Sequence, residues 1–259
     1  MKVLDLTAWL DAHHPERYAE SWDNVGLLVG DDTKEVTKVM LTLDLTENIV
    51  DQAIEAGADM IISHHPMIFS GMKRVNNHDF LGRKVLKLIQ HGIQYYAMHT
   101  NYDIIGMADL SADYFQLTDT RVLSVTAPEE EPQGIGRVGK LPRPMTLLEC
   151  AEHVKKCNKL EHVRIYGDPS AMIEEVAVCT GSGKSLLKDA LDSGAQVYIT
   201  GDIDHHTGLD AVEQGLFLID AGHFGTEYIF ADAMEKELAE AFPELEIVKA
   251  KMQQPYLLV

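Results

Sequence analysis

The 259-residue chain is poor in cysteine, in basic side chains and in long apolar runs. Its three cysteines, Cys150, Cys157 and Cys179, are odd in number and lack the regular spacing of a metal site or a disulfide framework. Cys150 and Cys157 lie seven residues apart on one helical face, which favours packing over chemistry. No apolar run is long enough to cross a bilayer, and no charged-then-apolar leader follows Met1. We therefore expect a soluble protein of a reducing, cytoplasmic compartment.

Basic side chains are outnumbered, because 22 Lys and Arg residues face 41 Asp and Glu residues and give a formal net charge of −19. An acidic surface repels the phosphates of duplex nucleic acid and provides no counterion release on binding them. Non-specific nucleic-acid binding is therefore disfavoured. A small phosphorylated substrate remains compatible with this charge where bound cations reverse its sign locally.

Short apolar segments alternate with segments of helical periodicity, which indicates an α/β fold. The segment 59–63 carries a continuous apolar run, Met60–Ile62, as is typical of a buried strand in a parallel sheet. A last edge strand is expected near 246–250. The segment 121–140 differs, because two prolines flank an acidic run there and glycines recur. We interpret it as a solvated loop or connector, with a binding tail as the alternative.

The two halves of the chain contain an internal repeat of apolar strands and glycine breaks. Two pairs of segments share an offset of 137 residues, and a third pair follows at an offset of 123. The pairs are Val39–Asp44 with Val176–Gly181, Gly57–Ile62 with Gly194–Ile199, and Gly92–Met98 with Gly215–Ala221. Chance similarity between two generic βαβ units is the alternative explanation.

This repeat predicts two interlinked, internally related α/β lobes with mostly parallel sheets. We place the first lobe at residues 1–120 and the second at 121–259, and the last helices could pack across the lobes. Because α/β proteins bind ligands at the carboxyl ends of their strands, we expect the strand ends of both lobes to converge on a common cleft.

Histidines and carboxylates follow the predicted strands at equivalent places in the two halves. His64 and His65 end the strand at 59–63, and Pro66 prevents the strand from continuing. Farther on, a histidine precedes a carboxylate by four residues in each half. Nitrogen and oxygen donors together suit Zn, Mn, Fe, Co or Ni, and bridging carboxylates could hold two such ions roughly 3.5–4 Å apart. Helix caps and hydrogen-bonded core histidines are the structural alternative.

Five motifs, taken in order, resemble those of the Nif-three-like family, whose members are often labelled GTP cyclohydrolase 1 type 2 homologues. They span nearly the whole chain: Ser21–Leu28, His64–Phe69, His99–Asp103, Gly201–His206 and Asp220–Glu227. The resemblance implies a short form without the middle insertion domain of longer relatives. It also implies a toroidal homohexamer whose metal sites face the inner cavity.

The same resemblance implies a dinuclear site in the cleft between the lobes, with two divalent transition metal ions per subunit. Carried over motif by motif, the implied metal ligands are His64, His65, Asp103, His223 and Glu227. His99 is implied to lie beside them, as a supporting or substrate-facing group.

The segment Thr180–Ser185 looks like a phosphate-binding loop between a strand and a helix. The pattern requires glycine five residues before Gly183, but Val178 occupies that position. A tight strand-to-helix turn without a ligand is therefore favoured over an anion site, although the backbone of a helix start can hold an anion.

These observations favour a metal-dependent hydrolase that acts on a nucleotide or purine-like small molecule through a metal-activated water. His99, Asp202 or His206 would move the proton to the leaving group. The alternative from another class is a non-catalytic hexameric metal-binding or scaffold protein, which would use the same ligands. A third hypothesis is a nucleotide-binding module that uses Gly181–Ser185.

Overall fold

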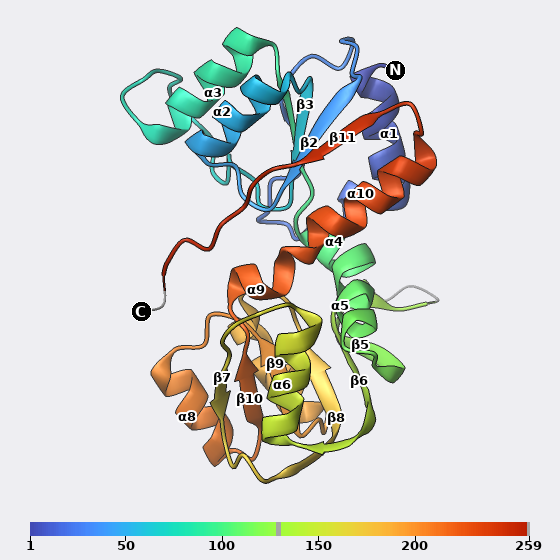
Figure 1. Cartoon of the computed structure of the whole chain (residues 1–259), viewed down its shortest axis with the longest axis vertical. Helices are drawn as coiled ribbons and strands as arrows, with labels where there is room; N and C mark the ends of the chain where they lie inside the picture. The colour runs from blue at the N-terminus through green and yellow to red at the C-terminus, as the bar shows by residue number, and fades with distance from the viewer. Residues whose placement is uncertain (128–130, 258–259) are drawn as a thin grey trace. The chain divides into compact units, whose positions relative to one another are not determined.

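The computed structural model describes residues 1–127 and 131–257, which divide into two compact units. The first unit comprises Met1–Tyr102 together with the chain from Phe230 onward, and the second comprises Asp103–Ile229 (Figure 1). This division differs from the predicted boundary at residue 120. The chain starts in the first unit, forms the second, and then returns to complete the first.

The first unit contains a five-stranded sheet of order β1-β4-β3-β2-β11. All neighbouring pairs are parallel except the edge pair β1·β4. The strands are β1 (Gly26–Val29), β2 (Lys38–Thr42), β3 (Met60–Ser63), β4 (Gln94–Ala97) and β11 (Glu246–Lys249). The predicted last edge strand is thus confirmed, and it belongs to the first sheet.

Helices cover both faces of this sheet (Figure 1). The helices α2 (Glu47–Ala56) and α3 (Phe80–His91) lie on one face, and α1 (Val3–His13) and α10 (Ile229–Ala241) lie on the other. Thr46 caps α2, because its side chain accepts a hydrogen bond from the Ile49 N–H at 3.3 Å. Gly92 ends α3 in the left-handed conformation.

The second unit contains a six-stranded mixed sheet of order β5-β6-β8-β9-β10-β7. Only β8·β9 and β9·β10 are parallel, so the expectation of mostly parallel sheets holds for the first sheet and not for the second. The strands are β5 (Thr118–Ala127), β6 (Gln133–Thr146), β7 (Arg164–Tyr166), β8 (Met172–Val178), β9 (Val197–Thr200) and β10 (Phe217–Asp220).

Short helical segments lead into this second sheet and connect its strands. In the first unit, the 3-10 turn η1 (Glu16–Tyr18) follows α1, and α4 (Thr100–Tyr102) follows β4; the π-helical turn η2 (Asp103–Met107) and α5 (Ala108–Tyr114) then begin the second unit. The others are α6 (Leu147–Cys157), the 3-10 turn η3 (Gly183–Leu186), α7 (Leu187–Asp192), α8 (His205–Glu213) and α9 (His223–Glu227). Among the described residues, no helix is long and apolar enough to cross a membrane.

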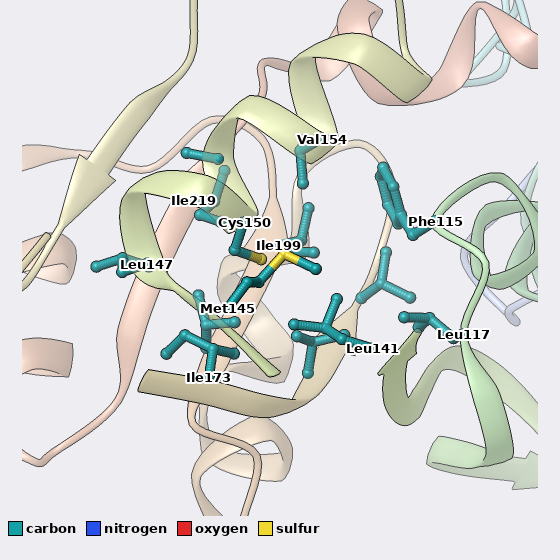
Figure 2. Close-up of a cluster of buried hydrophobic side chains, with 14 of the residues drawn as sticks. Phe115, Leu117, Leu141, Met145, Leu147, Cys150, Val154, Ile173, Ile199 and Ile219 are labelled. Carbon is teal, nitrogen blue, oxygen red and sulfur yellow. The ribbon is translucent and has the colours of Figure 1, made fainter. Parts of the chain in front are cut away.

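The core of the second unit lies on both faces of its sheet. Figure 2 shows one face, where Leu147, Cys150 and Val154 of α6 pack with Ile199 and Ile219 from the central strands. Burial raises the pKa of the Cys150 thiol to about 12, so it stays protonated at neutral pH. Cys150 therefore acts as a packing residue, as its helical spacing indicates.

The interpretation of 121–140 as a connector was wrong. Most of this segment lies in β5 and β6, which pair antiparallel with each other, and β6 also pairs with β8. The glycines permit close approach of neighbouring chains rather than loop freedom, because a Cβ on Gly134 would lie 2.0 Å from the Ser124 carbonyl oxygen. The predicted acidic run overlaps residues 128–130, which lie outside the described residues.

The internal repeat is confirmed by strand register. In the first sheet Val39 of β2 pairs with Met60 of β3, and in the second sheet Val176 of β8 pairs with Val197 of β9, so both partners shift by the predicted 137 residues. The third strand follows the shorter offset, because Met60 pairs with Gln94 and Val197 with Phe217. Each unit thus contains the same three adjacent parallel strands with an antiparallel edge strand beside the third.

Candidate metal centre

Three histidines of the first unit come together at the carboxyl ends of its strands. One ring nitrogen from each of His64, His65 and His99 lies within 4.8 Å of the others. The backbone N–H groups of His64 and His65 continue the pairing of β3, donating to the Thr42 and Leu43 carbonyl oxygens at 3.2 and 2.9 Å. The pair is therefore fixed by the sheet, and the His64 side chain is fully buried.

The same hydrogen-bond pattern orients all three imidazoles. In each, Nδ1 donates to an oxygen acceptor at 2.8–2.9 Å, which places the ring proton on Nδ1 and the lone pair on Nε2. An oxygen partner on the second ring nitrogen is the usual support of a metal-binding histidine. The acceptors are the Met98 carbonyl oxygen for His64, the Asp44 carboxylate for His65 and the Asp23 carboxylate for His99.

Asp23 fixes the orientation of His99. Its side chain is fully buried and accepts hydrogen bonds from His99 Nδ1 at 2.9 Å, from the Thr100 N–H at 3.0 Å and from Thr100 Oγ1 at 2.5 Å. Burial alone would raise the pKa of Asp23, but the hydrogen bonds from His99 and Thr100 lower it to about 2. Asp23 is therefore ionised at neutral pH. Sequence reasoning included it in a motif but assigned it no role.

A second donor set lies in the second unit, where α9 follows β10. His223 Nε2 lies 3.0 Å from Oε2 of Glu227, one helical turn later, and His223 Nδ1 lies 2.7 Å from Oδ2 of Asp202. Burial alone would lower the pKa of His223, but Glu227 and Asp202 raise it to about 9. Glu227 is only 4% exposed, so the helix delivers a buried carboxylate beside an imidazole.

Glycines bring the backbone unusually close to these donors. A Cβ on Gly181 would lie 2.0 Å from Oε1 of Glu227, and one on Gly201 would lie 2.6 Å from the backbone nitrogen of His223. The backbone of Gly181 is held on both sides, because its N–H donates to Thr226 Oγ1 at 2.8 Å and its carbonyl accepts from the Gly201 N–H at 2.9 Å. Sequence reasoning missed these contacts, although the repeat aligns Gly201 with His64.

Asp103 lies at the start of the π-helical turn η2, in the same unit as His223 and Glu227. Burial raises the pKa of the Cys179 thiol to about 12, and the charges of Asp103 and Glu227 act in the same direction. Both carboxylates therefore lie near Cys179, at the end of β8. The protonated thiol is a poor metal ligand, because metals bind the thiolate.

The predicted proton-transfer residues differ in their surroundings. Asp202 adopts a left-handed backbone conformation, with φ of +59°, and its carboxylate supports His223. His206 lies in the first turn of α8, with its ring 5.2 Å from that of His205. Across the described parts of the chain, His206 belongs to no group of three close donor side chains.

In the predicted tight turn at Gly181–Ser185, the backbone donors of Gly181 and Gly183 are engaged. The Gly183 N–H donates to Thr200 Oγ1 at 3.0 Å, and Gly181 is bonded as described above. Lys184 Nζ forms an exposed ion pair with Asp204 at 2.5 Å. These contacts favour a structural turn over a phosphate-binding loop.

The donor chemistry of both units fits a transition metal. The first unit offers imidazole nitrogens, and the second offers an imidazole with buried carboxylates. Mixed nitrogen and oxygen donors suit Zn, Mn, Fe, Co or Ni, whereas calcium and magnesium prefer oxygen alone.

Comparison with known proteins gives a consistent result over the whole chain. A model of the family Duf34/NIF3 (NGG1p interacting factor 3) matches residues 1–255. A protein named GTP cyclohydrolase 1 type 2 homolog from Clostridium acetobutylicum is 36% identical over 249 residues, covering 95% of this chain and 93% of that protein. One of the same name from Streptococcus pneumoniae is 37% identical over 246 residues, covering 93% and 91%.

Solved structures agree in fold. A hypothetical protein from Staphylococcus aureus has a TM-score of 0.92 at 32% identity and covers 100% of this chain and 99% of its own. Reduced HcgD from Methanocaldococcus jannaschii has a TM-score of 0.82 at 28% identity, with coverage of 97% and 98%.

Proposed function

The chain belongs to the Duf34/NIF3 family, and on that premise we propose that it is a dinuclear metal-dependent hydrolase of a nucleotide or purine-like small molecule. The names of the curated relatives, GTP cyclohydrolase 1 type 2 homolog, favour this substrate class. The cytoplasmic location expected from composition and the homohexamer implied by the resemblance remain predictions.

One observation carries the proposal. The imidazoles of His64, His65 and His99 lie close together, and Nδ1 of each is hydrogen-bonded to an oxygen. A histidine that only fills a core has no reason to bring a ring nitrogen within 4.8 Å of the ring nitrogens of two other histidines. For His64 and His65 this arrangement is the one expected of metal ligands whose orientation is fixed by supporting acceptors, with His99 beside them.

Two divalent transition metal ions would be held by His64, His65, Asp103, His223 and Glu227. When bound, such ions would lower the pKa of a water molecule and neutralise the oxygen anions of the substrate. The protein's own contribution is to hold the donors rigidly, through the sheet for the histidine pair and through the close-packed glycines for Glu227.

His99 is the residue we assign to proton transfer. Its Nδ1 proton is held by the ionised Asp23 carboxylate, so Nε2 is the atom that takes up or releases a proton. Asp202 holds Nδ1 of His223 in the same way, which makes it a positioning residue for that imidazole. His206 remains a predicted proton carrier on α8.

The test combines metal analysis with an activity screen on reconstituted protein. We expect about two transition metal ions per chain after mild purification, as the two-metal arrangement requires. We expect metal-dependent turnover of at least one compound in a panel of nucleotides, pterin precursors and phosphoesters. Glu227→Gln should abolish turnover with the fold intact, whereas the exposed Glu240→Gln should leave it unchanged.

Metal content and turnover together distinguish the hydrolase from the non-catalytic metal-binding assembly. Metal content below half of that value contradicts a dinuclear centre. Full metal content without turnover across the panel favours the non-catalytic metal-binding assembly instead. Activity retained in Glu227→Gln removes the role assigned to that carboxylate.

A further inference from the structure

Two large aromatic side chains of the first unit lie exposed beside its three histidines. Trp22 and Phe69 are each 54% exposed, and their ring centroids are 5.7 Å apart. Side chains of this size are usually buried for most of their surface, and an exposed neighbouring pair is typical of a binding surface. We call Trp22 and Phe69 the aromatic platform.

Residues on both sides of Trp22 are anchored by hydrogen bonds while its indole stays exposed. The Glu20 N–H donates to Thr100 Oγ1 at 2.8 Å, and Asp23 is bonded to His99 and Thr100. Asn24 Nδ2 donates to the Ile68 carbonyl oxygen at 2.5 Å, which ties the Trp22 loop to the residue before Phe69. The platform is therefore held in place before any ligand arrives, which lowers the entropy lost on binding.

The platform is continuous with the histidine cluster. The Trp22 ring lies 6.0 Å from that of His99 in an edge contact, and the His99 ring lies 5.4 and 5.5 Å from those of His64 and His65. A ligand whose flat ring stacks on Trp22 therefore has its substituents close to the three imidazoles. If the Trp22 side chain served only to cover apolar surface, it would not need to contact these polar imidazoles.

We propose that Trp22 and Phe69 form the subsite that stacks the flat heteroaromatic ring of the substrate, a purine base, with its anionic substituent directed to the histidines. Bases of any kind stack on exposed aromatic side chains through their π-faces. This inference rests on the proposed function, since it places the substrate ring next to the metal donors. It adds which residues recognise the ring.

Fluorescence of Trp22 tests the platform directly. The chain has two tryptophans, so a Trp9→Phe background leaves Trp22 as the sole indole. Guanosine 5′-monophosphate and adenosine 5′-monophosphate are titrated into the metal-reconstituted protein, with ribose 5-phosphate as the probe that lacks a base. We expect saturable quenching by the nucleotides and none by ribose 5-phosphate.

Calorimetry on matched variants supplies the second readout. Trp22→Ala and Phe69→Ala should each weaken nucleotide binding about 5- to 150-fold, the range associated with one base stacked on an aromatic side chain. Trp22→Phe should retain most of the affinity. All three variants should keep the metal content and the ribose 5-phosphate affinity of the parent, because neither residue is a donor.

Several results would overturn the inference: no saturable quenching by either nucleotide, equal affinity for ribose 5-phosphate and nucleotides, or unchanged nucleotide affinity in Trp22→Ala. A changed molecular mass of Trp22→Ala in light scattering, with nucleotide affinity intact, would assign the platform to a contact between copies of the chain. A parent protein without metal would refute the proposed function, and quenching in that same protein would still report whether the platform binds a base.

Discussion

Replacing Gly181 by alanine should displace the Glu227 carboxylate. The added Cβ would lie 2.0 Å from Oε1, whereas ordinary contacts begin near 3.4 Å, so the carboxylate must move by more than 1 Å. The backbone of Gly181 cannot retreat easily, because Thr226 and Gly201 hold it by hydrogen bonds on both sides. A misplacement of about 1 Å can lower turnover by about 100-fold, and a disturbed supporting group typically weakens metal binding about 10- to 100-fold.

Gly194→Ala is the matched control. Gly194 lies in the same unit with φ of +80°, close to the +64° of Gly181, but a Cβ there would meet nothing within 4 Å. Both alanines carry the left-handed backbone cost of about 1–2 kcal/mol, so both should lower the melting temperature by several degrees. Only Gly181→Ala should lose metal affinity, measured by competition with a chromophoric chelator. Equal metal affinities of the two variants would refute the reasoning.

Two further predictions follow from ion pairs. Because the pKa of Asp23 is lowered to about 2 from 3.8, its ionisation contributes about 2 kcal/mol of stability that is present above pH 3.8 and lost as the pH falls through 2. Urea unfolding of Asp23→Asn should therefore show a lower free energy at neutral pH and a flatter pH dependence in that window, and identical slopes would contradict the assignment. Lys184→Ala removes only an exposed pair with Asp204, so stability and nucleotide affinity should change little, whereas lost nucleotide affinity would restore the phosphate-loop hypothesis.

The parallel core of both units could be predicted from sequence because two local signals agree there. Apolar runs next to glycines recur at fixed offsets along the chain. The same offset relates the paired residues of the two sheets, so the repeat in sequence is also a repeat in strand register. The N-cap of α2 at Thr46 and the end of α3 at Gly92 depend on residues close to one another in the chain, so a local sequence pattern is enough to recognise them. Strand β11 was predicted as an edge but not to its sheet, since nothing local specifies which sheet a terminal strand joins.

The hairpin β5–β6 escaped prediction because its glycines and acidic residues have the composition of a loop. Its glycines serve close contacts between strands, which depend on partners distant in sequence. The candidate site shows the same limit. His64 and His223 can be recognised as candidate donors because each follows a predicted strand. The Met98 carbonyl oxygen that orients His64 has no sequence signature.

The return of the chain to its first sheet fixes an order of events during synthesis. Strand β2 keeps one unpaired edge until Glu246–Lys249 has left the ribosome, because β11 is its partner there. An exposed parallel edge of this kind invites pairing with other chains. The second unit, by contrast, is contiguous in sequence and is complete about twenty residues earlier. Nascent or truncated chains that stop before β11 should therefore be the aggregation-prone species, with the nested unit already folded inside them.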